Sequence, residues 1–311
     1  MAVHAQAPGR PATGRPPCQV PALRHQQFTM TPCPAHTDHP LPRPRAAFSL
    51  LMMVALMPAA ALADKPLWEL GLGAGVLHLP HYRGSDQTRD WLLPIPYFVY
   101  RGEVLRADRE GARAVLVDTP WVTLDLSLAV NTPTRSQDNQ AREGMADLAP
   151  TVEAGPSVNL MLSRGPGWQL DLRLPARAVF TVERQPRAIG WTVNPVLYLD
   201  VDLQGWDVAL QGGPVASSRT YNRYFYDVSA ADARAGRPAF SSSGGAAGWV
   251  ATANASRRWG PFWVGTYVQA DGLHGATFEA SPLLRQRLNL SYGLGLSWVF
   301  RESVARAADD R

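Results

Sequence analysis

Four residues in one short stretch could do chemistry: His78, His81, Ser85 and Asp86. Two histidines beside a carboxylate can ligate a metal ion, and serine with histidine and aspartate can form the nucleophilic site of a hydrolase. On an extended strand, residues three apart point to opposite faces, so His78 and His81 share a site only if the strand ends between them. We interpret Gly84, Ser85 and Asp86 as turn residues, in which the polar side chains cap backbone groups and glycine takes a positive φ.

Other candidates for catalysis are few after residue 63. The third histidine there is His274, and both cysteines, Cys18 and Cys33, lie before residue 63. A disulfide framework, a Cys-ligated zinc and a thiol nucleophile are therefore excluded from the body of the chain. The glycine-rich LGLGAGV has the form of a dinucleotide fingerprint, but no helix pattern follows it. We expect a protein that is not an enzyme, with no catalytic residue, metal or cofactor.

The first 63 residues have the composition of a leader. Residues 45–63 hold an apolar stretch that ends in small residues, which predicts a secretory signal peptide cleaved after Ala63; a membrane anchor is the alternative. We interpret residues 1–44 as a non-native or disordered extension. The leader carries the whole net charge of +4, because five arginines oppose one acid there, 5 − 1 = 4. The body is neutral, so nucleic-acid binding is not expected.

The body, residues 64–300, alternates apolar and polar side chains in long runs. The runs lie at 121–130, 168–180, 191–203 and 288–300. Alternation with a period of two is typical of strands that have one apolar face. No run of 18 apolar residues occurs after residue 63, so a membrane-spanning helix is not expected.

The connections between the predicted strands alternate in length. Eleven connections separate twelve strands, and short turns alternate with longer loops, such as 132–146 and 218–247, at all but one connection, the tight turn Glu110-Gly111. Outer-membrane barrels have short periplasmic turns and longer outer loops. We predict an all-β fold, a transmembrane antiparallel up-and-down β-barrel of about twelve strands, with ten or fourteen as alternatives. Residues 301–311 would form a periplasmic tail.

Aromatic and charged residues fit the same interpretation. All ten tryptophans follow residue 63, and nine lie at or near predicted strand ends, where interfacial girdles form. A large soluble β-sandwich or a lipocalin-like barrel would also alternate and is the alternative. In a membrane barrel the polar faces point inward, and these residues would either line a pore or pair across a narrow lumen and block it. The candidate lumen-lining residues are Asp125, Asp171, Arg173, Asp200 and Asp202.

Five pieces in order along the chain resemble the MipA/OmpV family of outer-membrane barrel proteins, over residues 66–300. They are LGLGAGV, HYRGSD with LLPIPYFVY after it, RTYNRYFYDVS, Ser281-Pro282 and the closing YGLGLSWVF. The motif positions are Tyr82, Gly84, Ser85, Asp86, Tyr221, Tyr224, Ser281 and Pro282. Two departures stand out: Tyr226-Asp227 replaces a more usual glycine, and eleven residues follow the terminal-strand aromatic Phe300, on which family members commonly end.

The resemblance implies a place and a role. Such proteins reach the bacterial outer membrane by Sec-type export with signal-peptide cleavage, contact its lipid, and are inserted by the barrel-assembly machinery, which reads the last strand's aromatic residue. One branch is described as a scaffold for a lytic transglycosylase and a bifunctional murein synthase, and others as porin-like or osmotically regulated. We expect a non-enzymatic scaffold for murein-synthesising and murein-hydrolysing enzymes. The alternative is a porin-like diffusion channel for small solutes, linked to osmotic adaptation.

Overall fold

The computed structural model describes residues 65–108 and 111–307, which belong to one compact unit, Ala61–Arg311. The extension expected at 1–44 and the signal peptide expected at 45–63, with its cleavage site Ala63, lie outside the described residues. The helices found are α1 (Arg219–Tyr226) and the 3-10 turn η1 (Ser136–Asp138). Within the described part of the chain, no helix has the length and apolar character needed to cross a membrane.

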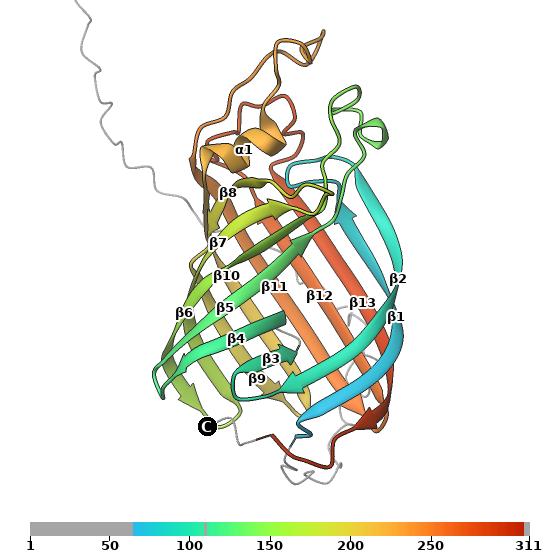
Figure 1. The fold of residues 1–311 in the computed structure, drawn as a ribbon, viewed down its shortest axis with the longest axis vertical. Coiled ribbons are helices and arrows are strands. Elements are labelled where there is room, and N and C mark those ends of the chain that lie inside the picture. Colours follow the sequence, from blue (N-terminus) through green and yellow to red (C-terminus); the bar gives the residue numbers. More distant parts are fainter. Residues whose placement is uncertain (1–64, 109–110, 308–311) are drawn as a thin grey trace, which may run out of the picture. The chain divides into compact units, whose positions relative to one another are not determined.

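Thirteen strands form one antiparallel sheet (Figure 1). β8 and β9 are two pieces of one wall strand, because both pair with β7 and β10 and only two residues separate them. Each wall strand pairs with its neighbours in sequence, and β13 pairs with β1 and closes the sheet. The predicted up-and-down barrel of twelve strands is confirmed. The strands are β1 (Trp68–Pro80), β2 (Thr88–Arg101), β3 (Leu105–Asp108), β4 (Gly111–Asp118), β5 (Val122–Asn131), β6 (Thr151–Gly165), β7 (Trp168–Thr181), β8 (Ala188–Val193), β9 (Val196–Leu203), β10 (Trp206–Ser217), β11 (Gly245–Trp259), β12 (Phe262–Gly272) and β13 (Leu288–Glu302).

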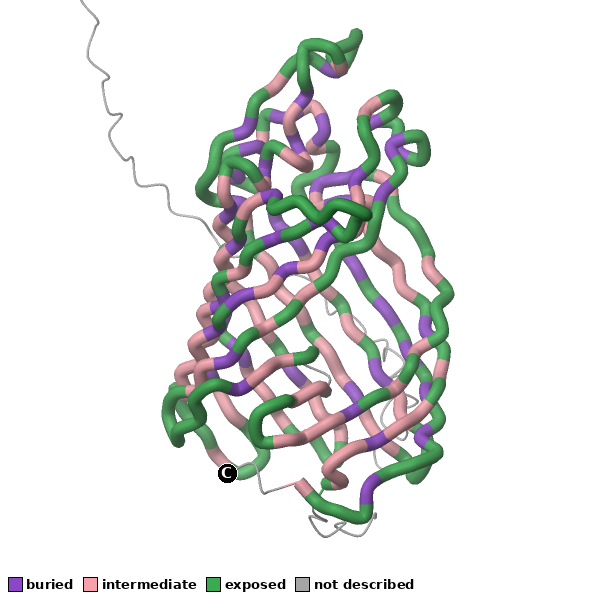
Figure 2. Tube along the Cα trace, in the orientation of Figure 1, coloured by how far each residue is buried: buried purple, intermediate pink, exposed green. Residues whose placement is uncertain are grey.

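Buried and exposed side chains alternate along the wall, as the tube in Figure 2 traces. On β13 the outward side chains from Leu288 to Phe300 are 50–55 % exposed, whereas the inward Asn289, Ser291 and Ser297 are at most 5 % exposed. A continuous outer band of large apolar side chains is stable against lipid and unstable against water. This pattern favours the membrane barrel over the soluble alternatives.

Glycines on the lumen face of β1 allow close packing of the wall. A Cβ atom on Gly75 would lie 2.4 Å from Cδ1 of Ile95, and one on Gly73 would lie 2.1 Å from the backbone oxygen of Leu296. The LGLGAGV segment therefore serves close side-chain packing inside the barrel.

The wall is interrupted at the connection where the alternation of lengths fails. β3 has four residues and β4 has eight, and β3 pairs with β2 only at Tyr100 and Arg101. β2 continues to Thr88 near the looped end, with β1 as its sole partner there among the described strands. The β3–β4 hairpin therefore ends part-way up the wall, between β2 and β5 (Figure 1).

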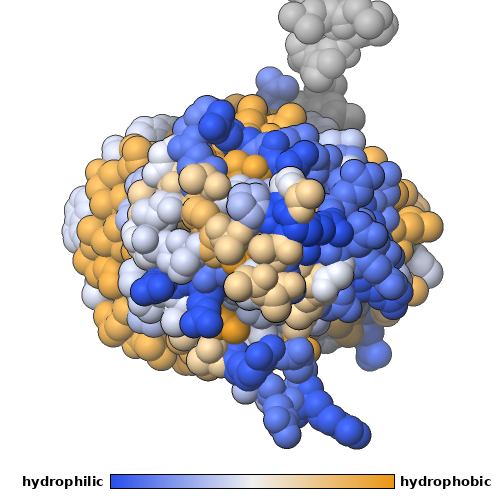
Figure 3. Space-filling model, turned by 90° about the horizontal axis from the view of Figure 1, so that it is seen from above, coloured by the Kyte–Doolittle hydropathy of each residue, from blue (hydrophilic) through white to orange (hydrophobic). Residues whose placement is uncertain are grey.

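The long connections gather at one end of the barrel and pack against each other (Figures 1 and 2). Their core contains the buried side chains of Tyr82, Leu148, Tyr226, Leu273 and Phe278. Viewed from above, side chains fill this end (Figure 3). Because long loops face the outside in such barrels and short turns face the periplasm, the looped end is assigned to the extracellular side.

The chain after the last strand folds back on the beginning of the barrel. β13 extends two residues beyond Phe300, to Glu302. Leu67 N then donates to Ala305 O at 2.9 Å, and Ala307 N donates to Lys65 O at 2.9 Å. The described part of the tail thus prolongs the seam between β13 and β1.

Candidate functional site

The barrel holds a cavity of about 1790 Å³ that opens at the short-turn end, where Lys65, Gly167 and Arg306 belong to its lining. All five candidate lumen residues line it, because they occupy alternate, inward positions on β5, β7 and β9: Asp125, Asp171, Arg173, Asp200 and Asp202. The lining carries nine basic and nine acidic side chains, so its net charge favours neither anions nor cations.

The charged lumen residues make contacts along the wall. Arg173 Nη2 lies 3.5 Å from Asp171 Oδ2 on the same strand, and its guanidinium group lies 3.4 Å from the centre of the Tyr198 ring on the neighbouring strand β9. Asn159 of β6 donates to Asp125 Oδ2 of β5 at 2.7 Å. These contacts follow the wall, beside the cavity.

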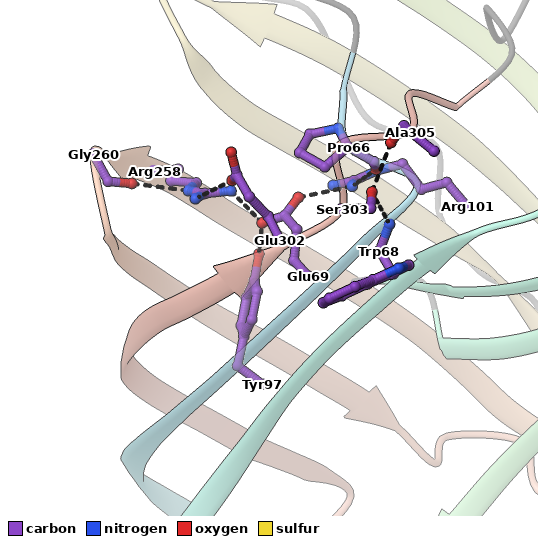
Figure 4. Close-up of polar contacts among 10 residues, drawn as sticks. All are labelled: Pro66, Trp68, Glu69, Tyr97, Arg101, Arg258, Gly260, Glu302, Ser303 and Ala305. Carbon is purple, nitrogen blue, oxygen red and sulfur yellow. Dashed lines mark hydrogen bonds and ion pairs between the residues drawn. The ribbon is translucent and has the colours of Figure 1, made fainter.

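A charged network forms the periplasmic rim (Figure 4). Glu69 of β1 is 2 % exposed and lies between two arginines: Arg101 Nη1 donates to its Oε1 at 2.7 Å, and Arg258 Nη1 donates to its Oε2. Arg258 also donates to Glu302 at 2.9 Å, and the Tyr97 hydroxyl donates to Glu69 at 3.3 Å. The network ties β1, β2, β11 and β13 together beside the cavity mouth.

The motif after β1 is fixed by residues more than two hundred positions away. The Tyr82 hydroxyl donates to Leu283 O at 2.6 Å. Gly84 has a φ of +94°, and its N–H donates to Asn289 Oδ1 of β13, while Asn289 Nδ2 donates to Ser85 O at 2.7 Å. The positive φ explains the glycine at this position.

The other motif positions join the same loop core. The Tyr226 ring stacks on Phe278 with centroids 3.7 Å apart, and its hydroxyl donates to Arg83 O at 2.8 Å. Burial raises the pKa of Tyr226, which keeps that hydroxyl a donor. Tyr226 thus helps to fill the loop core. Ser281 Oγ donates to Tyr226 O at 2.7 Å, and the Tyr224 hydroxyl accepts from Ala149 N at 2.8 Å. Asp86 Oδ2 lies 3.6 Å from Arg285 Nε, and the Tyr221 ring lies 4.9 Å from the Phe225 ring. Pro282 and Asp86 line the same small surface pocket.

Comparison with known families gives a match over most of the barrel. The model described as MltA-interacting protein MipA matches residues 72–300. The chain belongs to the MipA family. The comparison with curated proteins gave no match.

Solved structures similar to this MipA-family chain are outer-membrane proteins. Outer membrane phospholipase A from Escherichia coli is 10% identical, covers 76% of this chain and 94% of its own, and has a TM-score of 0.29. The CymD monoaromatic hydrocarbon channel is 9% identical, covers 77% and 90%, and has a TM-score of 0.35. At these identities and TM-scores the likeness says nothing of activity.

In this MipA-family barrel, the residues that suggested catalysis hold loops together. β1 ends at Pro80, so His81 lies beyond the strand. Asn139 Nδ2 donates to His81 Nδ1 at 3.1 Å and to Ser85 Oγ at 3.0 Å, and Ser85 Oγ donates to Gln87 O at 3.0 Å. Ser85 is fully buried, so its hydroxyl is a poor nucleophile at this site.

His78 belongs to a different surface from His81. It lies on the outward face of β1, stacks on Tyr292 at 4.7 Å and has its Nδ1 2.6 Å from Asp90 Oδ1. His274 lies in the loop after β12, 3.9 Å from Glu279. Across residues 65–108 and 111–307, no three histidine, cysteine or carboxylate side chains come together as metal ligands.

Two charged groups of this MipA-family site were not among the residues predicted from the sequence. One is the rim pair of Glu69 and Arg258, and the other is Arg83, whose Nε lies 2.8 Å from Asp271 Oδ1 at the top of the lumen. The sequence did carry a signal for both groups, which is a single charged residue at an inward position of a strand. Glu69 is such a residue in the glycine-rich β1, and Asp271 is such a residue in β12.

Proposed function

We propose that this outer-membrane barrel is a non-enzymatic scaffold that binds murein-hydrolysing and murein-synthesising enzymes on its periplasmic side. The family is described by its interaction with MltA, and the sequence resemblance implies a lytic transglycosylase and a bifunctional murein synthase as partners. The observation that carries the proposal is the contrast between the two ends of the barrel. Side chains fill the looped end, and the cavity opens at the short-turn end.

The short-turn end offers a surface suited to a protein partner. The tail presents Val304, which is 96 % exposed, beside the exposed Arg306. Lys65 and Glu103 are exposed at the same mouth. An exposed apolar side chain at a mouth that carries charges of both signs offers a partner a contact that is stabilised by burial and charges that give specificity.

Affinity purification of the tagged, full-length protein from outer membranes tests the scaffold. We expect wild type to recover a lytic transglycosylase, and Val304→Asp with Arg306→Glu to lose it. Arg234→Glu in the outer loops, where Arg234 contacts Glu143 at 3.3 Å, is the control and is expected to behave as wild type. Absence of murein enzymes from the wild-type sample, or equal recovery by the rim variant, would contradict the proposal.

A second candidate function is a diffusion channel, which the polar cavity of about 1790 Å³ favours. Conductance in planar bilayers tests it with the full-length protein and with a variant in which a short turn replaces residues 219–244. Stable steps from the full-length protein would favour the channel. Flat traces from the full-length protein and steps from the variant would mean that the loops close the lumen.

A further inference from the structure

The interrupted wall leaves a long strand edge without a partner. Arg101 N donates to Leu67 O, so the N–H group of this odd-numbered residue points toward the β1 side. The pairing of β2 with β1 has no bulge, so the N–H and C=O groups of the other odd-numbered β2 residues also point toward β1. The groups of even-numbered residues point the other way, where β3 pairs with the last two residues of β2. From Thr88 to Phe98, none of the described strands lies on that side. Backbone groups at membrane depth need a polar neighbour, such as water in a cavity.

Two prolines stand on this open edge. Pro94 and Pro96 are even-numbered, so the N–H groups that they lack are the ones that would point into the opening. Proline on an edge strand prevents further strand pairing. An added peptide strand, or the edge of a second copy, would meet two missing donors within three residues. The edge therefore favours an occupant that needs no backbone hydrogen bonds.

The polar cavity reaches the lipid-facing surface through this opening. Its lining includes Pro96 and Phe98 of β2 and Leu128 of β5, and the outward Phe98 and Leu128 are 52 % and 47 % exposed. Ile95, on the inward face of β2, belongs to the same lining. An aliphatic chain in the opening would contact apolar side chains on both sides.

A row of arginines crosses the wall at the lower border of the opening. Arg101 of β2 is the register partner of Arg106 of β3, and Arg106 is the partner of Arg113 of β4. All three line the cavity. Glu69 and Asp118 approach Arg101 and Arg106 at 2.7 and 3.0 Å. Arg106 and Arg113 have further contacts as well. Directly opposed like charges in a sheet repel, so negative charge beside this row is stabilising.

We propose that the opening between β2 and β5 is a lateral binding site for an anionic amphiphile, a molecule with an aliphatic chain and a carboxylate or phosphate head group. The chain lies against Phe98 and Leu128, and the head group enters the cavity and binds Arg106 and Arg113. Arg177 adds a further guanidinium group at this level. Its Nε donates to Ser127 Oγ at 2.9 Å, and Ser127 of β5 is the register partner of Arg113. Arginine binds carboxylate and phosphate through two parallel hydrogen bonds, which neutral head groups do not match. The site lies at the wall of the same cavity, and the proposal requires neither the scaffold nor the channel function.

A photoreactive dodecanoate tests the site, with the full-length protein in nanodiscs of zwitterionic phosphatidylcholine. Cross-links are expected on β2 near Phe98 and on β5 near Leu128. Unlabelled dodecanoate is expected to compete, and dodecanol and dodecyltrimethylammonium are not. Arg106→Gln with Arg113→Gln is expected to weaken dodecanoate binding by at least about tenfold, because each lost contact is a hydrogen bond between charged groups. Arg234→Gln in the outer loops is the matched control and is expected to bind as wild type.

A second variant keeps the arginines in place. Ala129→Trp adds bulk on β5, where Ala129 lines the cavity beside Leu128, and is expected to weaken binding as well; the folded state of each variant is checked by its heat-modifiable gel mobility. Equal binding by wild type and both variants, equal competition by dodecanol, or cross-links spread around the wall would overturn the proposal. An anionic phospholipid that copurifies and is displaced by dodecanoate identifies a membrane lipid as the ligand. Binding without such a lipid identifies a free acid, and either result supports the site.

Discussion

At the scale of single residues, the loop end depends on a hydrogen bond that one protonation state provides. Arg142 N donates to Asn139 Oδ1 at 3.2 Å, which leaves Asn139 Nδ2 to donate to Nδ1 of His81. Nδ1 must then be an unprotonated acceptor. Burial lowers the pKa of His81 from its usual 6.5, so the packed loops favour this neutral form.

We therefore expect the loop end to loosen as the pH falls. In loosened loops His81 binds a proton below about pH 6.5, whereas in the packed loops it does so only at lower pH. The hydrogen bond to neutral His81 therefore stabilises the packed loops fully above about pH 6.5. This stabilisation is lost as the pH falls through the lowered pKa of His81. Limited proteolysis of residues 132–150 between about pH 8 and pH 5 measures the effect. Wild type is expected to be cut faster at low pH, and His81→Asn at a rate that changes little with pH. His274→Asn, at an exposed histidine, should keep the wild-type profile, and a flat profile for wild type would contradict the role of His81.

The rim carboxylate gives a second prediction at this scale. Glu69 is 2 % exposed between Arg101 and Arg258, so Glu69→Gln leaves two guanidinium groups facing a neutral amide. We expect the free energy of unfolding to fall by about 2 kcal/mol, less than for a fully dry ion pair because both arginines contact water. Urea unfolding in detergent micelles measures the change, with Glu103→Gln at an exposed turn position as the control. A loss no larger than that of the control would show that the network contributes little.

At the scale of elements, the strands were predictable because a period of two is visible in any run such as WVTLDLSLAV. Two features were not. The predicted run 191–203 is divided into β8 and β9 at Asn194 and Pro195, where proline removes a donor from the ladder. The tight turn predicted at Glu110-Gly111 includes Glu110, which lies outside the described residues. How far β3 and β4 extend along the wall depends on how β3 pairs with β2, and that register is set by contacts absent from the local pattern.

Glycine packing in β1 gives a prediction for one element. Gly73→Ala places a methyl group 2.1 Å from the backbone oxygen of Leu296, and backbone can move only if strands β1 and β13 separate. We expect this overpacking to lower the free energy of unfolding by about 2 kcal/mol. Gly212→Ala in β10 is the control, because its Cβ would lie 3.4 Å from the nearest atom and should change stability by less than about 0.5 kcal/mol. Urea unfolding of both variants decides, and equal stability would contradict the packing argument.

At the scale of the whole molecule, alternation in the sequence predicts which charges share the inward face of a strand, but it does not predict how the loop end assembles. The five lumen residues follow from alternation within single strands. The hydrogen bond from Tyr82 to Leu283 spans 201 positions and that from Arg83 to Asp271 spans 188, and local patterns carry no information about such pairs. Of these positions the family motifs named Tyr82, without giving its contact.

Two features near the end of the last strand have different expected roles: the outward aromatic ring of Phe300 and the backbone hydrogen bonds made by the residues after Glu302. Phe300 faces outward, is 54 % exposed and lies 5.7 Å from the Trp298 ring, so removal of its ring costs little internal packing. Residues 303–307 instead carry backbone hydrogen bonds to the segment before β1. The resemblance to the family implies that the assembly machinery reads the aromatic residue of the last strand, which here is not the last residue of the chain.

We therefore expect Phe300→Ala to affect insertion into the membrane, and a truncation after Glu302 to affect the stability of the folded barrel. Phe300→Ala should reduce the amount of folded barrel in outer-membrane fractions, while the refolded protein unfolds within about 0.5 kcal/mol of wild type. The truncation should keep insertion, because it leaves β13 complete, and should lower the stability of the refolded protein by about 1–2 kcal/mol through the lost seam hydrogen bonds. Heat-modifiable mobility in membrane fractions measures insertion, and urea unfolding of the refolded proteins measures stability. If Phe300→Ala inserts like wild type and the truncation does not, the residues after β13 carry the assembly signal in this chain.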